Sequence, residues 1–145
     1  SDGQLLRIPA ASVRPQGRAA SGMAGIRLAA GAEVVSFTVV VADDDGVVVT
    51  VAGSGSALPG TEAGTVKVTP FAEYPGKGRG TGGVRCHKFR SGEDRIVQAW
   101  VGRGPARAAS ASGVPVPLPE PDPRRDATGV PAVAPIDAIA GRLSL

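Results

Sequence analysis

The sequence predicts an all-β fold built from repeated, propeller-like units, and three observations support that prediction. The stretch from Gly17 to Leu28 returns about sixty residues later, from Gly78 to Phe89, and a clipped copy stands at 124–130. The flanks of the two long copies also align without gaps. The segments between the turns are short and rich in β-branched residues. Self-similarity at a fixed period of tens of residues indicates a propeller, a solenoid or another array.

The alignment sets the limits of the repeats. Gly3 pairs with Gly64, every later position keeps that offset, and a shortened third copy opens at Gly113. We therefore expect about two complete blades and a partial third, all within one domain that spans 1–145. The predicted repeat units cover residues 1–41, 46–102 and 104–145, within a few residues at each end.

Each unit is predicted to run strand, loop, strand, turn, strand. In the first unit a short strand from Gly3 ends at Pro9, because proline cannot donate to a β-ladder. The stretch 18–28 has too many glycines for a helix, since each costs about 1 kcal/mol relative to alanine, so it is predicted as a second β segment. Residues 34–41 are β-branched and apolar on both alternating sets, which predicts a third strand covered on both faces. A further strand is predicted at 47–52.

Composition indicates a packed domain with an aliphatic core. The apolar fraction is 42%, mean hydropathy is +0.06 and aromatic residues make up only 3%. No apolar run reaches the roughly 18 residues that span a bilayer, and no signal peptide opens the chain. The single cysteine, Cys86, fits a reducing compartment. We expect a cytoplasmic protein that is not membrane-bound, and a chain that is a piece of a longer one.

Charge is concentrated in the second unit. The net charge is +3 overall, but the stretch 67–107 carries nine basic and three acidic residues, a net charge of +6. Such a concentration is typical of a nucleic-acid footprint. The acidic run Asp43-Asp44-Asp45-Gly46 is predicted to be a solvated turn, since it lacks the glutamate and spacing of a calcium loop.

No catalytic residue and no metal ligand is expected in the chain. His87 is the only histidine, and Cys86 beside it points to the opposite face of a strand, so the two cannot form a nucleophile pair. Tyr74 aligns with Val13, and Trp100 aligns with a valine of the first unit. Both aromatic residues are therefore predicted to pack in the core.

One family has repeats of this form. The pattern Gly-Arg-x-x-x-Gly-apolar-x-x-apolar, then a Gly–acidic turn and Val-Val-x-x-x-Val, resembles the repeats in the C-terminal domains of the A subunits of DNA gyrase and topoisomerase IV. The resemblance is strongest over 3–41 and 64–102. The gyrase box Gln-Arg/Lys-Arg-Gly-Gly-Arg/Lys-Gly has no copy here, and the nearest stretch is 76–83. The choice between gyrase and topoisomerase IV therefore stays open.

The resemblance implies a β-pinwheel, a propeller-like disc whose blades share strands and whose basic rim binds and bends duplex DNA. It implies three partners for a nucleoid-associated cytoplasmic protein, which are double-stranded DNA, the ATPase (B) subunit of the topoisomerase, and the remainder of the A subunit. The parent protein would be an ATP-dependent type II topoisomerase. No cofactor is expected in this chain, because ATP and Mg²⁺ would be used elsewhere in the parent enzyme.

Arginine and lysine neutralise phosphates without reading sequence, and glycines beside them let the backbone approach the duplex. The predicted DNA-binding residues are Arg14, Arg18, Arg27, Lys77, Arg79, Arg85, Lys88, Arg90, Arg124 and Arg125. Arg18, Arg79 and Arg125 recur at one place in every repeat, so guanidinium groups bound to backbone carbonyls are an open alternative for them. The rival function is a protein-binding scaffold with little DNA affinity, which the modest overall charge favours. An extracellular lectin is disfavoured by the unpaired Cys86 and the few aromatic residues.

Overall fold

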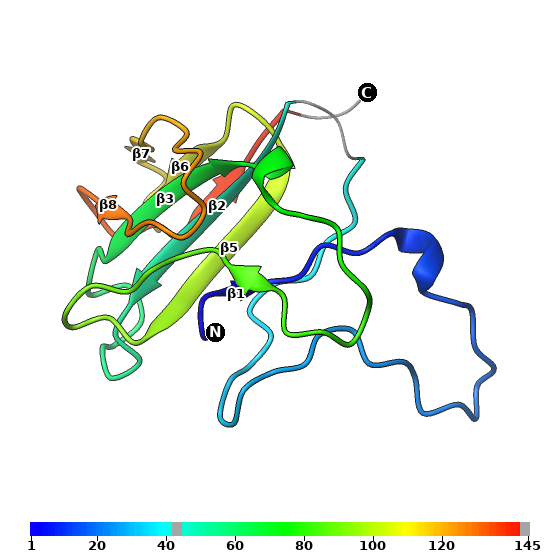
Figure 1. The fold of residues 1–145 in the computed structure, drawn as a ribbon. Helices are drawn as coiled ribbons and strands as arrows, with labels where there is room; N and C mark the ends of the chain where they lie inside the picture. Colours follow the sequence, from blue (N-terminus) through cyan, green and yellow to red (C-terminus); the bar gives the residue numbers. More distant parts are fainter. Residues whose placement is uncertain (42–44, 143–145) are drawn as a thin grey trace.

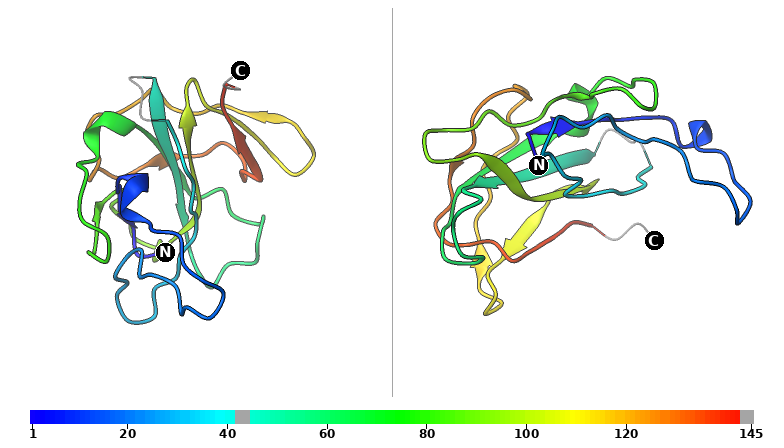
Figure 2. Two further views of the ribbon diagram at one scale, coloured as in Figure 1. Left: turned by 90° about the vertical axis from the view of Figure 1, so that its right-hand side faces the viewer. Right: turned by 90° about the horizontal axis from the view of Figure 1, so that it is seen from below.

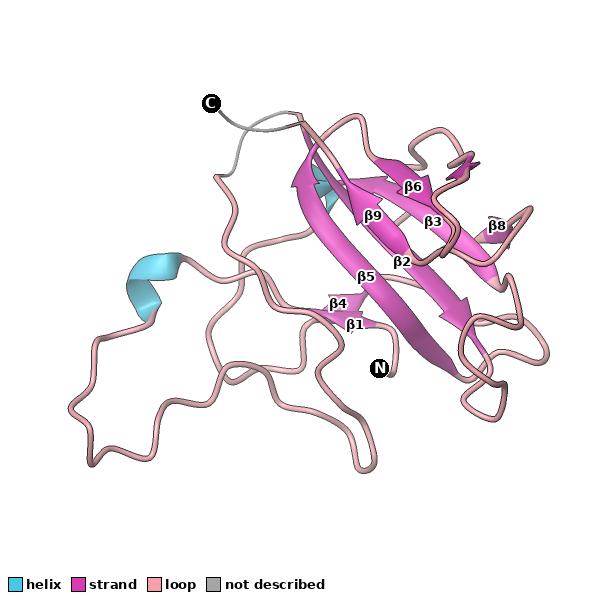
Figure 3. Cartoon of the chain, turned by 180° about the vertical axis from the view of Figure 1, so that it is seen from behind, coloured by secondary structure: helices cyan, strands magenta, loops and turns pink. Residues whose placement is uncertain are grey.

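The computed structural model describes residues 1–41 and 45–142. These residues form an all-β fold with three antiparallel sheets and two single-turn 3-10 helices, Ala10–Ser12 (η1) and Phe71–Glu73 (η2) (Figure 1). The strands gather in one part of the molecule, while most of the first unit extends from it as open loops (Figures 2 and 3). The predicted all-β, propeller-like class is confirmed.

The central sheet has four strands in the order β5-β2-β3-β8. Its strands are β2 (Gly46–Gly53), β3 (Thr65–Pro70), β5 (Arg95–Arg103) and β8 (Val130–Pro131). Val49, in the middle of β2, lies opposite Val68 on one side and Trp100 on the other. The strand predicted at 47–52 is therefore present as β2, and its β-branched residues pair on both edges.

Two smaller sheets flank the central one. The first joins β1 (Gln4–Leu5) to β4 (Val84–Arg85), and the second has the order β7-β6-β9. The strands of the second are β6 (Arg107–Ala109), β7 (Pro115–Val116) and β9 (Ala138–Ala140). This order matches β3-β2-β5 of the central sheet, so the third unit repeats the same topology over shorter strands.

At two places a strand of one unit pairs, in the same way, with a strand of the next unit. Leu5 of β1 pairs with Val84 of the second unit, and Val66 of β3 pairs with Val130 of the third. Leu5 and Val66 are aligned positions of the sequence repeat. The flanking backbone bonds repeat too, from Cys86 N–H to the Gly3 carbonyl at 2.8 Å and from Ala132 N–H to the Gly64 carbonyl at 3.1 Å. The central sheet and the β1–β4 sheet are thus each built from two repeat units.

The core lies on the two faces of β2. One cluster gathers Val48, Phe71, Tyr74 and Cys86. The other gathers valines of β2 and β3, with Trp100 half-buried against them. Tyr74 is only 1% exposed, so the packing roles predicted for the tyrosine and the tryptophan are confirmed.

The prediction of a third strand in the first unit is wrong. Residues 34–41 form no strand, and Phe37, Val39 and Val41 are 81%, 75% and 84% exposed. The aligned segment of the second unit is β5, whose ladder is made with β2. No strand of the described ranges lies beside 34–41 in the same way, so its β-branched residues have no partner.

The second β segment predicted at 18–28 is also absent, because that stretch contains only turns and irregular backbone. Its aligned counterpart, β4, is a strand only because β1 of the preceding unit pairs with it. The described residues contain no such partner for 18–28. Of the predicted acidic turn, Asp43 and Asp44 lie outside the described residues, and Asp45 pairs with Arg103 at 3.2 Å.

Candidate nucleic-acid interface

The loops of successive units meet at junctions that repeat along the chain. At the first junction Arg27 N–H donates to the Thr81 carbonyl at 2.9 Å, and at the second Lys88 N–H donates to the Ala127 carbonyl at 3.1 Å. Arg27 and Lys88 are aligned positions. Both side chains are exposed and have no hydrogen bond or ion pair with any described residue. An exposed, unpaired basic side chain therefore lies at the equivalent position of each junction.

Four further predicted residues also present free cations. Arg14 and Arg18 are exposed in the loop that follows η1, Arg85 is exposed on β4, and Arg90 is exposed in the turn before β5. Within the described ranges none of these side chains makes a hydrogen bond or ion pair. Six of the ten predicted residues can thus meet a polyanion without first breaking a protein contact.

Two of the predicted residues are engaged with the protein backbone. Arg79 Nη1 donates to the Ala24 carbonyl of the first unit at 2.7 Å, and Lys77 Nζ donates to the Gly83 carbonyl at 3.2 Å. Arg79 is half-buried. The structural alternative is therefore the better description of Arg79, which ties one repeat to the next.

The third unit offers less free charge than its sequence indicates. Arg124 forms a bidentate ion pair with Asp122, with N–O distances of 3.0 and 2.9 Å. These hydrogen bonds lower the pKa of the Asp122 carboxyl to about 2. Arg125 is half-buried, and its Nε is buried without a hydrogen-bond partner. The guanidinium of Arg124 is therefore paired, and the side chain of Arg125 is only partly exposed.

Part of the basic character of the second unit lies inside the fold. Lys67 is 2% exposed, and its Nζ donates to the Cys86 carbonyl at 3.2 Å and to the Arg125 carbonyl. Burial lowers the pKa of this lysine to about 8. Arg95 pairs with Glu33 at 3.5 Å. The charge of +6 counted from the sequence therefore overstates the surface charge of this unit.

Comparison with known proteins identifies the family. The family model described as the DNA gyrase C-terminal domain, β-propeller, matches residues 1–40 and 60–99, more than half of the chain. The chain belongs to this gyrase family.

The relatives of this gyrase-family chain are topoisomerase subunits. The chain is 37% identical over 101 residues to topoisomerase subunit TopoM of Mycolicibacterium smegmatis, a match that covers 70% of the chain and 13% of that protein. It is 46% identical over 76 residues to the A subunit of DNA gyrase from Aeromonas salmonicida, covering 52% and 7%. With the A subunit of DNA gyrase from Escherichia coli it shares 37% over 99 residues, covering 68% and 10%. The matched segment is thus about a tenth of each relative.

A buried histidine joins the second and third units of this gyrase-family domain. His87 Nδ1 lies 2.9 Å from Thr50 Oγ1, and Nε2 accepts the Gly129 N–H at 3.1 Å. Thr65 Oγ1, 3.2 Å from Nε2, donates to Glu93 at 2.5 Å. Because Nε2 accepts, the proton sits on Nδ1 and the ring is neutral. Burial lowers the pKa of this histidine to about 4.

The geometry assembles no nucleophile pair from Cys86 and His87. Cys86 packs in the first core cluster, where burial raises the pKa of its thiol to about 11, so the sulfur is protonated at neutral pH. The His87 ring is held by the contacts described above. Over the described ranges, no group of three or more histidine, cysteine, aspartate or glutamate residues could hold a metal ion, and no helix is long and apolar enough to cross a membrane.

Sequence reasoning missed the structural roles of Lys67 and His87, although a signal was present. Lys67 aligns with Leu6, and His87 aligns with Ile26. A polar residue that takes the place of a branched apolar one in the repeat marks a core position. Both side chains are buried, and each is hydrogen bonded to the backbone of the third unit.

Proposed function

We propose that this domain binds duplex DNA without sequence specificity and bends it, as the accessory C-terminal domain of the A subunit of a type II topoisomerase. The observation that carries the proposal concerns two cationic side chains at aligned positions, Arg27 and Lys88. Both are exposed and unpaired, and both stand at the equivalent place of successive repeat junctions. Membership of the gyrase family supports it.

The physical basis is the spacing of charge along an array. Cations repeated from unit to unit contact successive phosphates and release condensed counterions, and they carry no sequence information. Bending a site of 20–30 base pairs by 40–90° costs on the order of 1–6 kcal/mol. Contacts on several units offset that cost only when the duplex follows the array. Arg14, Arg18, Arg85 and Arg90 complete the proposed contact set.

The proposed partners within the enzyme follow from the relatives, which are much longer than this chain. We propose that the domain works with the ATPase (B) subunit of the enzyme and with the remainder of the A subunit. ATP hydrolysis, Mg²⁺ and strand passage belong to those other parts. The role of this domain is then to hold and bend the DNA segment that the rest of the enzyme acts upon.

The test is a titration of a plain duplex of a few tens of base pairs at several salt concentrations. If about five phosphates are contacted, the slope of log K against log salt is near −4.5, a loss of roughly 500-fold between 50 and 200 mM. The double variant Arg27→Ala/Lys88→Ala should make the slope about 1.8 units shallower.

The matched control removes two other exposed charges, which take no part in the two junction hydrogen bonds. Arg107 on β6 and Arg142 near the C-terminus are both exposed, so Arg107→Ala/Arg142→Ala changes the net charge equally. If the two double variants lose the same affinity, binding depends on overall charge and the junction assignment is wrong. Weak binding with a flat salt dependence in the unaltered protein would favour the protein-scaffold function instead.

A further inference from the structure

We propose that Glu93 is a positioning residue for DNA binding, because its carboxylate fixes the turn that carries Arg90 against the central sheet. This role rests on the proposed function, since Arg90 belongs to the proposed contact set. Glu93 is an acidic residue in the most basic unit of the chain. Charge alone predicts that such a residue opposes DNA binding.

The Glu93 carboxylate bonds to the turn and to the sheet at the same time. Its Oε2 accepts the Arg90 N–H at 2.7 Å, and its Oε1 accepts the Thr65 hydroxyl at 2.5 Å. Thr65 lies in β3 and is only 6% exposed. One carboxylate oxygen is therefore bound to a buried strand, and the other holds the backbone of an exposed turn.

The backbone of the turn depends on this one residue. Of the backbone groups in residues 89–92, only the Arg90 N–H and carbonyl are hydrogen bonded within the described ranges. Both bond to Glu93, and the Arg90 carbonyl accepts the Glu93 N–H at 3.0 Å. Without the carboxylate the turn would keep that second bond, but its Arg90 amide and its tie to β3 would be lost.

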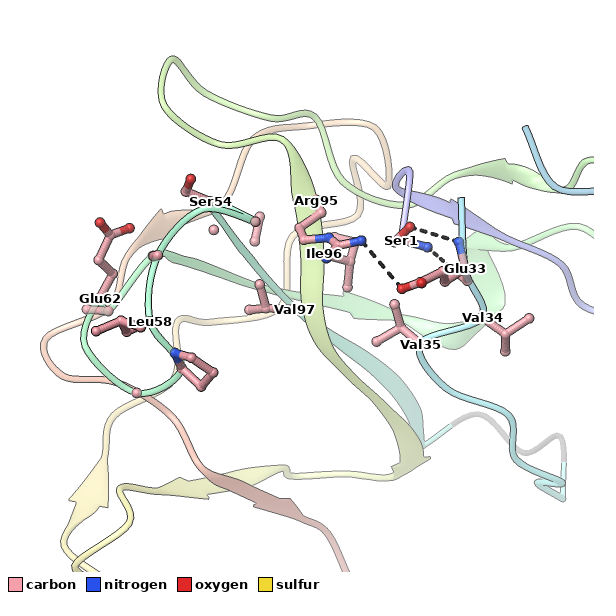
Figure 4. A pocket seen from close by; sticks show the side chains of 18 residues that line it. Ser1, Glu33, Val34, Val35, Ser54, Leu58, Glu62, Arg95, Ile96 and Val97 are labelled. Atoms are coloured by element: carbon pink, nitrogen blue, oxygen red, sulfur yellow. Dashed lines mark hydrogen bonds and ion pairs between the residues drawn. The ribbon is translucent and has the colours of Figure 1, made fainter. Parts of the chain in front are cut away.

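The two flanks of the turn are anchored independently of the carboxylate. On one side the Lys88 N–H is bonded to the third unit. On the other side the Asp94 N–H donates to the Gly53 carbonyl at 3.0 Å, and Arg95 pairs with Glu33 at 3.5 Å (Figure 4). Loss of the carboxylate would therefore loosen the turn without releasing the segments beside it.

The first unit contains the same turn without a carboxylate. Ala29 and Ala32 align with Arg90 and Glu93, and the Ala32 N–H donates to the Ala29 carbonyl at 3.1 Å. The turn therefore forms without an acidic residue. Of the two long copies, the one that carries the cation also carries the carboxylate. Turn formation does not explain Glu93, whereas holding Arg90 in place does.

A fixed turn favours binding because a cation that is already in place loses less conformational freedom when it meets a phosphate. Ordering one mobile side chain on binding lowers affinity by about 2- to 10-fold. A carboxylate near the duplex also repels phosphate, so charge alone predicts tighter binding when it is removed. The positioning role predicts weaker binding. The two explanations therefore differ in the sign of one measurement.

The test is the variant Glu93→Ala in the salt-dependent duplex titration. Alanine is the residue that the first unit has at this place, so the turn should still form. We expect affinity to fall about 2- to 10-fold. The salt slope should become shallower by up to about 0.9, the share of one phosphate. In an Arg90→Ala background the same substitution should not weaken binding further, because no guanidinium remains to be positioned.

The charge-matched control is Glu62→Ala. Glu62 is exposed in the loop between β2 and β3 and makes no hydrogen bond or ion pair with any described residue. It projects from that loop away from Arg95 (Figure 4). Its removal changes the net charge as Glu93→Ala does, so affinity should stay the same or rise.

A second pair of variants tests the sheet end of the contact. Thr65→Val has nearly the same shape and removes the donor to Glu93, whereas Thr65→Ser keeps the hydroxyl. Thr65→Val should reproduce part of the loss of affinity, and Thr65→Ser should bind like the unaltered protein. Without DNA, hydrogen exchange of the Arg90 amide should quicken about 10-fold or more in Glu93→Ala, while the amides of β2 keep their rates. That difference separates local loosening from general unfolding.

Three outcomes would overturn the role of Glu93. The first is that Glu93→Ala binds as tightly as the unaltered protein or more tightly. The second is that the loss of affinity persists in the Arg90→Ala background, because the effect would then not act through Arg90. The third is weak binding with a flat salt dependence in the unaltered protein, which would also overturn the proposed function. Steep salt dependence with no loss in Glu93→Ala would leave the proposed function standing.

Discussion

The two long copies of the repeat have nearly the same pattern and different structures. Residues 64–103 contain three strands, two of which lie in the four-stranded sheet. Residues 3–41 contain one two-residue strand, the single-turn helix η1 and otherwise turns and irregular loops. The difference lies in the neighbours, because β5 has β2 beside it and 34–41 has no corresponding strand among the described residues. A strongly β-branched segment is therefore not sufficient for a strand, since its ladder partner comes from another part of the array.

The largest expected effect separates two aligned glycines. Gly22 and Gly83 both have positive φ, +85° and +74°, but a Cβ on Gly83 would lie 2.5 Å from the Leu5 carbonyl oxygen, while one on Gly22 meets nothing within 4 Å. Gly83→Ala should cost more than about 3 kcal/mol of unfolding free energy, and Gly22→Ala about 1–2 kcal/mol from the backbone conformation alone. Urea denaturation measures both, and equal losses would contradict the close β1–β4 contact.

The second prediction concerns pH and the buried imidazole of His87. The pKa of this group is about 4 when folded and about 6.5 when unfolded. Between those values the unfolded chain binds more protons, so stability falls as pH drops from 6.5 to 4. The loss is at most about 1.4 kcal/mol per pH unit, and about 3 kcal/mol in total.

The variant His87→Gln keeps an acceptor toward Gly129 and removes the titration, whereas the carboxylates titrate alike in both proteins. Unfolding free energies measured from pH 7 to 4 should therefore show a shallower slope in the variant. Parallel pH profiles for the two proteins would show that His87 is not held neutral.

The third prediction compares Lys67 with its aligned residue Leu6. Lys67→Met removes the donor to the carbonyls of Cys86 and Arg125, and leaving buried acceptors unpaired costs about 1–3 kcal/mol. Leu6→Met is a volume-conserving change in a half-buried position and should cost less than about 1.5 kcal/mol. Thermal unfolding of both variants tests the difference. An unchanged Tm for Lys67→Met would show that the hydrogen bonds of this lysine do not stabilise the fold.

The smallest expected effect separates Arg79 from Arg18. Arg79→Ala loses the hydrogen bond to Ala24 and should cost about 0.5–1.5 kcal/mol. Arg18 is exposed and unpaired, so Arg18→Ala should change stability by less than about 0.5 kcal/mol. In the DNA titration the order reverses, and Arg18→Ala should reduce the salt slope more than Arg79→Ala does. If Arg18→Ala and Arg79→Ala behaved identically in both assays, the arginine would have the same environment in the two repeat copies.

Much of the fold could be predicted from the repeat and its β-branched segments. β2 was expected from the valines at 47–52, and the packing of Tyr74 followed from its alignment with Val13. The strand at 34–41 could not be judged from its own sequence, because whether it pairs depends on residues far from it. Propensity describes a segment, whereas a ladder is a property of two segments.

The candidate interface was predictable in part. Exposed cations such as Arg27 and Lys88 were expected from the repeat, and their contact with DNA stays a prediction. The burial of Lys67 and the pairing of Arg124 with Asp122 were missed because counting charges treats every lysine and arginine as a surface group. Only the structure shows which cations the fold has already used.

The exchange of strands between units also has a consequence for how such an array can change length over evolution. The second unit both receives and gives a strand, because β1 of the first unit pairs with its β4 and its β3 pairs with β8 of the third. A tandem duplication of one whole repeat therefore preserves every pairing, wherever in the repeat its breakpoints fall. The loss of half a repeat would instead leave two neighbouring blades each short of a strand. Such arrays are expected to grow and shrink by whole periods, with genetic breakpoints free to fall inside strands as well as in loops.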